Sequence, residues 1–156
     1  MQASIARAFR FDRVQTGIRR ALMEKGQLLR ALILLNALAM SAAAVVLAIW
    51  PDGIPNTVAI SLYPDQRLLA YLLGAGELAL AYLCYSAAFT MQQQLLRQTS
   101  LVLIVLHSAS GLAGLAAVAE GASILVLANV ALRVLLVVAL VVLVPRKIRR
   151  DFRDAR

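Results

Sequence analysis

Four long apolar runs dominate the pattern of hydrophobic and polar positions along the chain. They cover about residues 31–50, 68–90, 99–119 and 122–144. Each run is long enough to cross the roughly 30 Å hydrocarbon core of a bilayer, which takes about 20 helical residues. Backbone groups in lipid must find hydrogen-bond partners within their own segment, so each run is predicted to be an α-helix. The pattern therefore predicts an all-α integral membrane four-helix bundle over residues 31–144.

Composition supports a membrane location for a single domain. Hydrophobic residues make up 62% of the 156 residues. A small soluble domain leaves a large share of its chain exposed to water and could not bury this much apolar surface. Lipid is therefore expected to cover part of the protein.

Basic residues lie at the two ends of the chain and predict its orientation. The formal net charge is +8, but these side chains flank the apolar runs, so we predict no nucleic-acid partner. The middle loop carries Arg97, and the basic tail covers residues 145–156. The positive-inside rule places both termini and the Arg97 loop in the cytoplasm of a bacterial-type inner membrane.

The first 30 residues are predicted to form a cytoplasmic, basic amphipathic helix. Phe11, Val14, Ile18 and Leu22 recur at three- and four-residue spacing. Such a helix can lie on an anionic leaflet or dock on a partner protein, and we favour the lipid surface. The basic residues expected at the membrane surface are Arg7, Arg10, Arg13, Arg19, Arg20 and Lys25.

The loops between the apolar runs are predicted to differ in length. Residues 51–66 form a longer outer loop that opens with the turn-forming Pro51-Asp52-Gly53. Glu120-Gly121 is a very short link, so the last two helices are expected to form a tight antiparallel hairpin.

Polar side chains within the apolar runs are the candidates for a functional site. Ionisable groups at mid-bilayer are costly and are therefore functional candidates by default. This intramembrane polar centre consists of Glu77, His107, Asn129, Arg133 and Asn36. Asn129 precedes Arg133 by four residues, so its side chain could hydrogen-bond the guanidinium.

Small residues recur along the second and third runs and predict close helix packing. They follow a heptad-like spacing, and small side chains let membrane helices approach each other. The predicted packing seam comprises Ala70, Gly74, Ala81, Cys84, Ala88, Ser110 and Gly114. We expect a left-handed bundle whose interior receives Glu77, His107, Asn129 and Arg133.

The polar centre has two interpretations. In the first, Glu77 and Arg133 form a buried pair that fixes the helix register, and each offsets the cost of the other's charge. In the second, the same residues form a pocket that binds a lipid headgroup or a quinone, or passes protons between Glu77 and His107. We favour the structural pair and predict no cofactor, although His107 could serve as a single axial ligand to a haem or pigment.

Catalytic and metal-binding motifs are not found in the sequence. There is no HExxH, GxSxG, P-loop or GxGxxG pattern, and Cys84 is the only cysteine. An intramembrane enzyme would need a nucleophile and an orienting group that cannot be assembled around His107. We therefore predict no catalytic residue and no metal site, and we lean against an enzyme.

The segment Leu73-Gly74-Ala75-Gly76-Glu77-Leu78 resembles the second helix of small DoxX-like bacterial membrane proteins. These are four-helix proteins with a Gly-x-x-Glu-Leu element at that point, and the resemblance covers the second and third runs. It implies a small bundle associated with quinone-linked redox systems and a role for Glu77. The basic N-terminal helix and Arg133 depart from the family pattern.

Two functions follow from these observations. The first is a non-enzymatic accessory or structural subunit, which packs in a homo-oligomer or a larger membrane complex. The alternative is a binder or transporter of a small molecule (a lipid, a quinone or a proton) that uses Glu77, His107 and Arg133.

Overall fold

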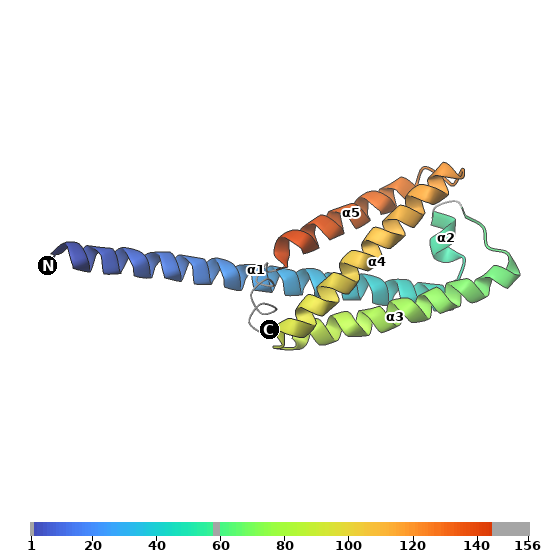
Figure 1. Ribbon diagram of the computed structural model, residues 1–156. Coiled ribbons are helices and arrows are strands. Elements are labelled where there is room, and N and C mark those ends of the chain that lie inside the picture. The colour runs from blue at the N-terminus through green and yellow to red at the C-terminus, as the bar shows by residue number, and fades with distance from the viewer. Residues whose placement is uncertain (1, 58–59, 145–156) are drawn as a thin grey trace, which may run out of the picture.

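The computed structural model describes residues 2–57 and 60–144, with the backbone alone for residues 2–22. The helices are α1 (Gln2–Ile49), α2 (Gly53–Thr57), α3 (Arg67–Phe89), α4 (Gln93–Ala119) and α5 (Val126–Leu143), with a 3₁₀ turn η1 at Pro64–Gln66. Figure 1 shows their arrangement. Over the described residues the fold is entirely helical, as predicted.

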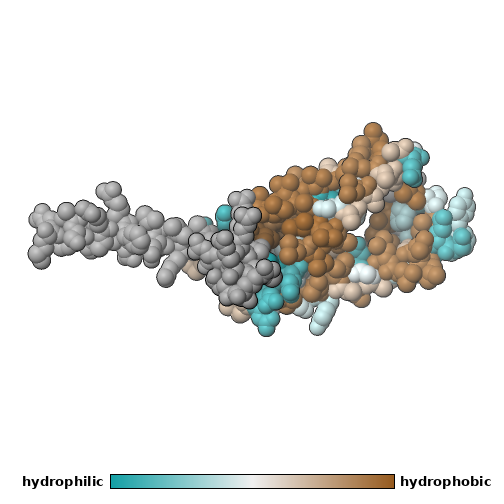
Figure 2. Space-filling view, in the orientation of Figure 1, coloured by the Kyte–Doolittle hydropathy of each residue, from teal (hydrophilic) through white to brown (hydrophobic). Residues whose placement is uncertain are grey.

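Four helices are long and apolar enough to cross a membrane. The spans are Met23–Ile49, Pro64–Phe89, Gln93–Ala119 and Val126–Leu143, with mean hydropathy of 2.5, 1.6, 2.1 and 2.8. Many large apolar side chains point away from the bundle, and Figure 2 shows apolar atoms over most of the visible helical face. Lipid satisfies such a surface, so the protein is a multi-pass membrane protein.

The N-terminal segment is helical, but it is not the separate helix that we predicted. α1 runs for 48 residues without a break and continues from the first span well beyond the other helices. The sequence has no proline before residue 51, and Gly26 lies in open space where a helix tolerates it. The side chains expected on the membrane surface, from Arg7 to Arg20, and the tail 145–156 lie outside the described residues.

The spans are paired as two hairpins. α1 packs along α3 and α4 packs along α5, whereas contacts between the two pairs are few. A Cβ at Gly74 would lie 3.2 Å from Leu47 Cβ, and one at Gly114 would lie 2.8 Å from Val130 Cγ2. At these two positions the predicted small-residue seam packs within a hairpin, because glycine allows the helices to approach closely.

The hairpins join through one cluster of buried side chains. It lies toward the end where α3 and α4 are connected, and its members touch across all four spans. These residues are Leu29, Ile33, Ala37, Met40, Ala81, Cys84, Ala87, Leu96, Leu103 and Leu140. Away from this cluster the two hairpins diverge (Figure 1).

The link between α4 and α5 is longer than Glu120-Gly121. Gly121 has a φ of +100°, its amide donates to Val118 O at 3.1 Å, and the Ala122 amide donates to Ala117 O at 2.9 Å. These two bonds form a Schellman motif, which ends α4. Ser123 Oγ then accepts from the Leu125 amide at 3.3 Å, and α5 begins at Val126 instead of residue 122.

The loop between α1 and α3 holds the short helix α2 and the turn η1. Gly53 packs against Trp50, where a Cβ would lie 2.8 Å from the indole ring. An exposed ion pair joins Arg67 Nη2 to Asp52 Oδ2 at 3.2 Å. The start of the loop is therefore tied to the start of α3.

Candidate functional site

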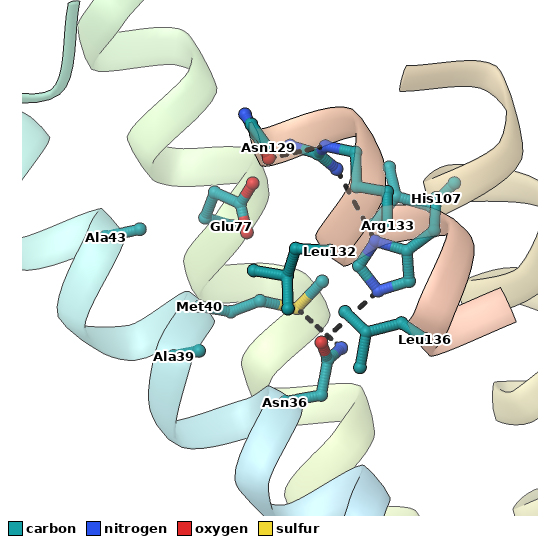
Figure 3. A pocket seen from close by; sticks show the side chains of 11 residues that line it. Asn36, Ala39, Met40, Ala43, Glu77, His107, Asn129, Leu132, Arg133 and Leu136 are labelled. Atoms are coloured by element: carbon teal, nitrogen blue, oxygen red, sulfur yellow. Dashed lines mark hydrogen bonds between the residues drawn. The ribbon is translucent and has the colours of Figure 1, made fainter. Parts of the chain in front are cut away.

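The predicted polar centre lines one cavity between the two hairpins. The cavity has a volume of about 160 Å³ and is open to the surroundings. Its walls come from all four spans and are formed by Asn36, Ala39, Met40, Ala43, Glu77, Leu106, His107, Asn129, Leu132, Arg133 and Leu136. Figure 3 shows most of these side chains around it. The structure thus brings together all five polar residues that the sequence singled out.

His107 hydrogen-bonds at both ring nitrogens, and its bond to Asn36 connects the two hairpins. Its Nε2 lies 3.2 Å from Asn36 Oδ1, and its Nδ1 lies 3.4 Å from Arg133 Nη1. Because a guanidinium can only donate, Nδ1 must accept and the ring proton must be on Nε2. Asn36 Nδ2 in turn donates to Met40 Sδ at 3.6 Å. Asn36 and His107 therefore satisfy each other's polar groups across α1 and α4.

Arg133 is held by neutral partners on its own hairpin. Its Nε donates to Asn129 Oδ1 at 3.1 Å, which confirms the bond predicted from their four-residue spacing. Its Nη1 donates to Ser110 Oγ at 2.6 Å. We had placed Ser110 in the packing seam, yet its hydroxyl is a ligand of the guanidinium. Its position three residues after His107 puts both on one helix face, a signal that could have suggested this role.

Glu77 faces the cavity from the opposite hairpin without pairing with Arg133. The carboxylate points into the space between α3 and α5 (Figure 3), and Glu77 is half-buried. No described residue donates a hydrogen bond to its oxygens. The ion pair among the described residues joins Arg67 to Asp52 and does not involve Glu77. The direct Glu77–Arg133 pair that we favoured is therefore not formed.

The packing-seam residues do not line this cavity, although Ser110 bonds to Arg133 beside it. Ala70, Gly74, Ala81 and Cys84 are buried in α3, whereas Ala88, Ser110 and Gly114 are partly buried. Cys84 is fully buried and free. These residues set the spacing of the helices that carry the polar groups.

Arg30 is a structural residue that sequence reasoning missed. Its Nη1 donates to Ala88 O at 2.7 Å and to Thr90 O at 2.5 Å. These carbonyls lie at the end of α3, where a helix has unsatisfied acceptors and partial negative charge. Arg30 therefore caps α3 and fastens it to α1 at the same end as the buried cluster.

The hydrogen bonds determine which groups of the site stay free. His107 uses both ring nitrogens in hydrogen bonds, so it has no free lone pair for a haem or for a proton from Glu77. No group of three His, Cys, Asp or Glu residues that could hold a metal ion occurs in the described part of the chain. What remains is a charged acceptor and a charged donor on opposite walls of an open cavity.

Comparisons with protein-family models, with curated proteins and with solved structures find no match to this chain.

Proposed function

We propose that the protein binds a small, membrane-soluble molecule in the cavity between its two hairpins. One observation carries this proposal: Glu77 and Arg133 line the same cavity but do not pair. Opposite charges in a low-dielectric setting attract strongly, so a purely structural pair should close to direct contact. Here neutral side chains hold Arg133 instead, and about 160 Å³ lies open. A single water needs only roughly 10–15 Å³.

The membrane setting narrows the ligand to a lipid or a quinone. Apart from the five residues of the polar centre, the cavity wall is apolar, and it includes Leu106, Leu132 and Leu136. Sites of this composition suit amphiphiles, whose polar group meets a few well-placed partners. The resemblance of the Glu77 segment to DoxX-like proteins stays a prediction, and of the two ligands it would favour the quinone.

The placement in the cell is part of the same proposal. We infer a bacterial-type inner membrane with both termini in the cytoplasm, because the basic residues flank the spans on that side. In this orientation α1 extends into the cytoplasm. That anionic headgroups or a partner bind the basic residues stays a prediction, which concerns Arg7, Arg10, Arg13, Arg19, Arg20 and Lys25.

Neutral substitutions at the two charged positions test the binding function. The protein is purified in mild detergent, and retained small molecules are identified by native mass spectrometry. We expect Glu77→Gln and Arg133→Gln each to retain about tenfold less of the wild-type ligand, since one charge-assisted contact of roughly 1.4 kcal/mol is lost. The matched controls are Asp52→Asn and Arg67→Gln, which make the same charge changes at the ion pair between the loop and the start of α3 and should retain the ligand fully.

Folding is checked by helical circular dichroism and thermal unfolding. If a single variant unfolds, the double variant Glu77→Gln/Arg133→Gln carries no lone charge and should fold without retaining the ligand. A wild-type protein that retains no small molecule would contradict the proposal. So would full retention by the double variant.

A second candidate function is a non-enzymatic accessory subunit of a homo-oligomer or a larger membrane complex. The observation in its favour is the long continuation of α1 beyond the other helices (Figure 1). The same native mass spectra report whether another chain co-purifies. A lone monomer would count against this function.

A further inference from the structure

The donors and acceptors on the cavity wall indicate what kind of molecule fits. Arg133 uses Nε for Asn129 and Nη1 for Ser110 and His107. Its Nη2 group has no hydrogen-bond partner among the described residues, and neither does the amide nitrogen of Asn129. A guanidinium has five N–H donors in a fixed fork. One wall therefore offers free donors beside a positive charge.

The opposite wall offers the complementary group. Glu77 extends from α3 into the same cavity, and its two carboxylate oxygens accept no hydrogen bond from the described residues. An ionised carboxylate has about four lone-pair sites and no donor. A ligand that satisfies this wall therefore needs a hydrogen-bond donor, preferably a positively charged one.

Charge balance then selects among ligand classes. The polar centre carries one positive and one negative group, so a net anion or a net cation would leave one charge uncompensated in a poorly solvated site. A quinone has acceptors only, so it would satisfy Arg133 and leave Glu77 without a donor. A zwitterion satisfies both walls, with its anionic oxygens at Arg133 and its ammonium at Glu77.

We propose that the ligand is the zwitterionic headgroup of a membrane amphiphile, with a phosphate at Arg133 and a primary ammonium at Glu77. This inference rests on the binding function proposed above. Arg133 Nη2 and the Asn129 amide nitrogen can both donate to phosphate oxygens, and an ammonium is a compact donor suited to a carboxylate. The hairpins diverge away from their shared buried cluster, and Leu132 and Leu136 line the cavity between them. Acyl chains can therefore remain in lipid while the headgroup enters.

The test uses the full chain in nanodiscs that contain phosphoethanolamine and phosphoglycerol lipids with identical acyl chains in equal amounts. Lipids retained after detergent extraction are counted by native mass spectrometry. We expect the wild-type protein to prefer the phosphoethanolamine lipid by about tenfold. Glu77→Gln leaves a positive centre and should reverse the preference towards the anionic phosphoglycerol lipid. Glu77→Gln/Arg133→Gln should show no preference.

Several outcomes would overturn the inference. A wild-type protein that prefers phosphoglycerol, or that retains an added quinone in place of either lipid, would show that the centre does not select a zwitterion. An unchanged preference in Glu77→Gln would show that the carboxylate does not meet the ammonium. In each case the molecule is still retained, so the binding function would survive. Retention of nothing would remove both proposals.

A soluble zwitterion gives the last arm of the test. O-phosphoethanolamine carries the same phosphate and ammonium without acyl chains. We expect it to leave the lipid in place, because the apolar chains contribute most of the affinity for a site reached from the bilayer. Complete displacement of the lipid by this soluble compound would overturn the assignment of an amphiphile.

Discussion

At the scale of single residues, the polar centre is a chain of hydrogen bonds with one direction. Arg133 can only donate, so His107 accepts at Nδ1, donates from Nε2 to Asn36, and Asn36 donates to Met40. Each donor fixes the role of the next residue. His107 and Asn36 are buried, with 6% and 8% exposed, so breaking the chain leaves a polar atom without water to replace its partner.

Replacing Asn36 with Leu tests this chain. His107 Nε2–H would lose its acceptor, and we expect the free energy of unfolding to fall by about 1–2 kcal/mol. Unfolding is measured by denaturant titration in detergent micelles. Leu35→Ala is the control, because Leu35 is 63% exposed on the lipid side of the same helix. Its effect should stay within about 0.5 kcal/mol. Equal losses in the free energy of unfolding of the two variants would contradict this chain of hydrogen bonds.

At the scale of elements, the sequence predicted the spans well and their ends less well. Hydropathy located all four helices because lipid imposes a minimum apolar length on each. The start of α5 was predicted four residues early, since residues 122–125 are apolar enough to continue a span. The Schellman motif at Gly121 and the Ser123 turn determine the actual start. Such hydrogen bonds between neighbouring residues are invisible to an apolar window.

Contacts between elements were harder to predict. Asn129 and Arg133 are one turn apart, so their bond follows from helix geometry. The bonds from Arg30 to Ala88 and Thr90 join residues 58 and 60 positions apart and depend on the register of α1 against α3. The gap between Glu77 and Arg133 depends on how the hairpins diverge. Neither register nor divergence is encoded in the hydropathy pattern of a single helix.

Arg30 provides the element-scale prediction. Arg30→Gln removes two charge-assisted bonds at the end of α3, and we expect stability to fall by about 1–3 kcal/mol. Faster hydrogen exchange is expected at the amides near Ala88. The control is Lys25→Gln, which removes the same charge from an exposed position on α1. Thermal unfolding in detergent and exchange mass spectrometry supply the readouts. An equal effect of the two substitutions would mean that Arg30 acts by charge alone.

At the scale of the whole molecule, the pairing of the spans explains why the site exists. Two hairpins are each tightly packed through a glycine, at Gly74 and at Gly114, and they share one buried cluster. A bundle packed evenly along its length would have closed over the polar centre. Because contacts between the pairs are few, space remains between Glu77 and Arg133. The packing seams and the polar centre are thus parts of one arrangement.

The orientation of this arrangement in the bilayer yields a final prediction. Asn56 lies in the loop between α1 and α3, and Gln94 lies at the start of α4, so the two exposed residues are at opposite ends of the spans. Each is replaced by cysteine in a Cys84→Ala background and treated with a maleimide that cannot cross the membrane. The positive-inside rule places Asn56 outside and Gln94 in the cytoplasm. Asn56→Cys should therefore react in intact spheroplasts, and Gln94→Cys only after permeabilisation. The reverse labelling pattern would show that the orientation is the opposite one. Reaction of both cysteines from outside would contradict the multi-pass arrangement itself.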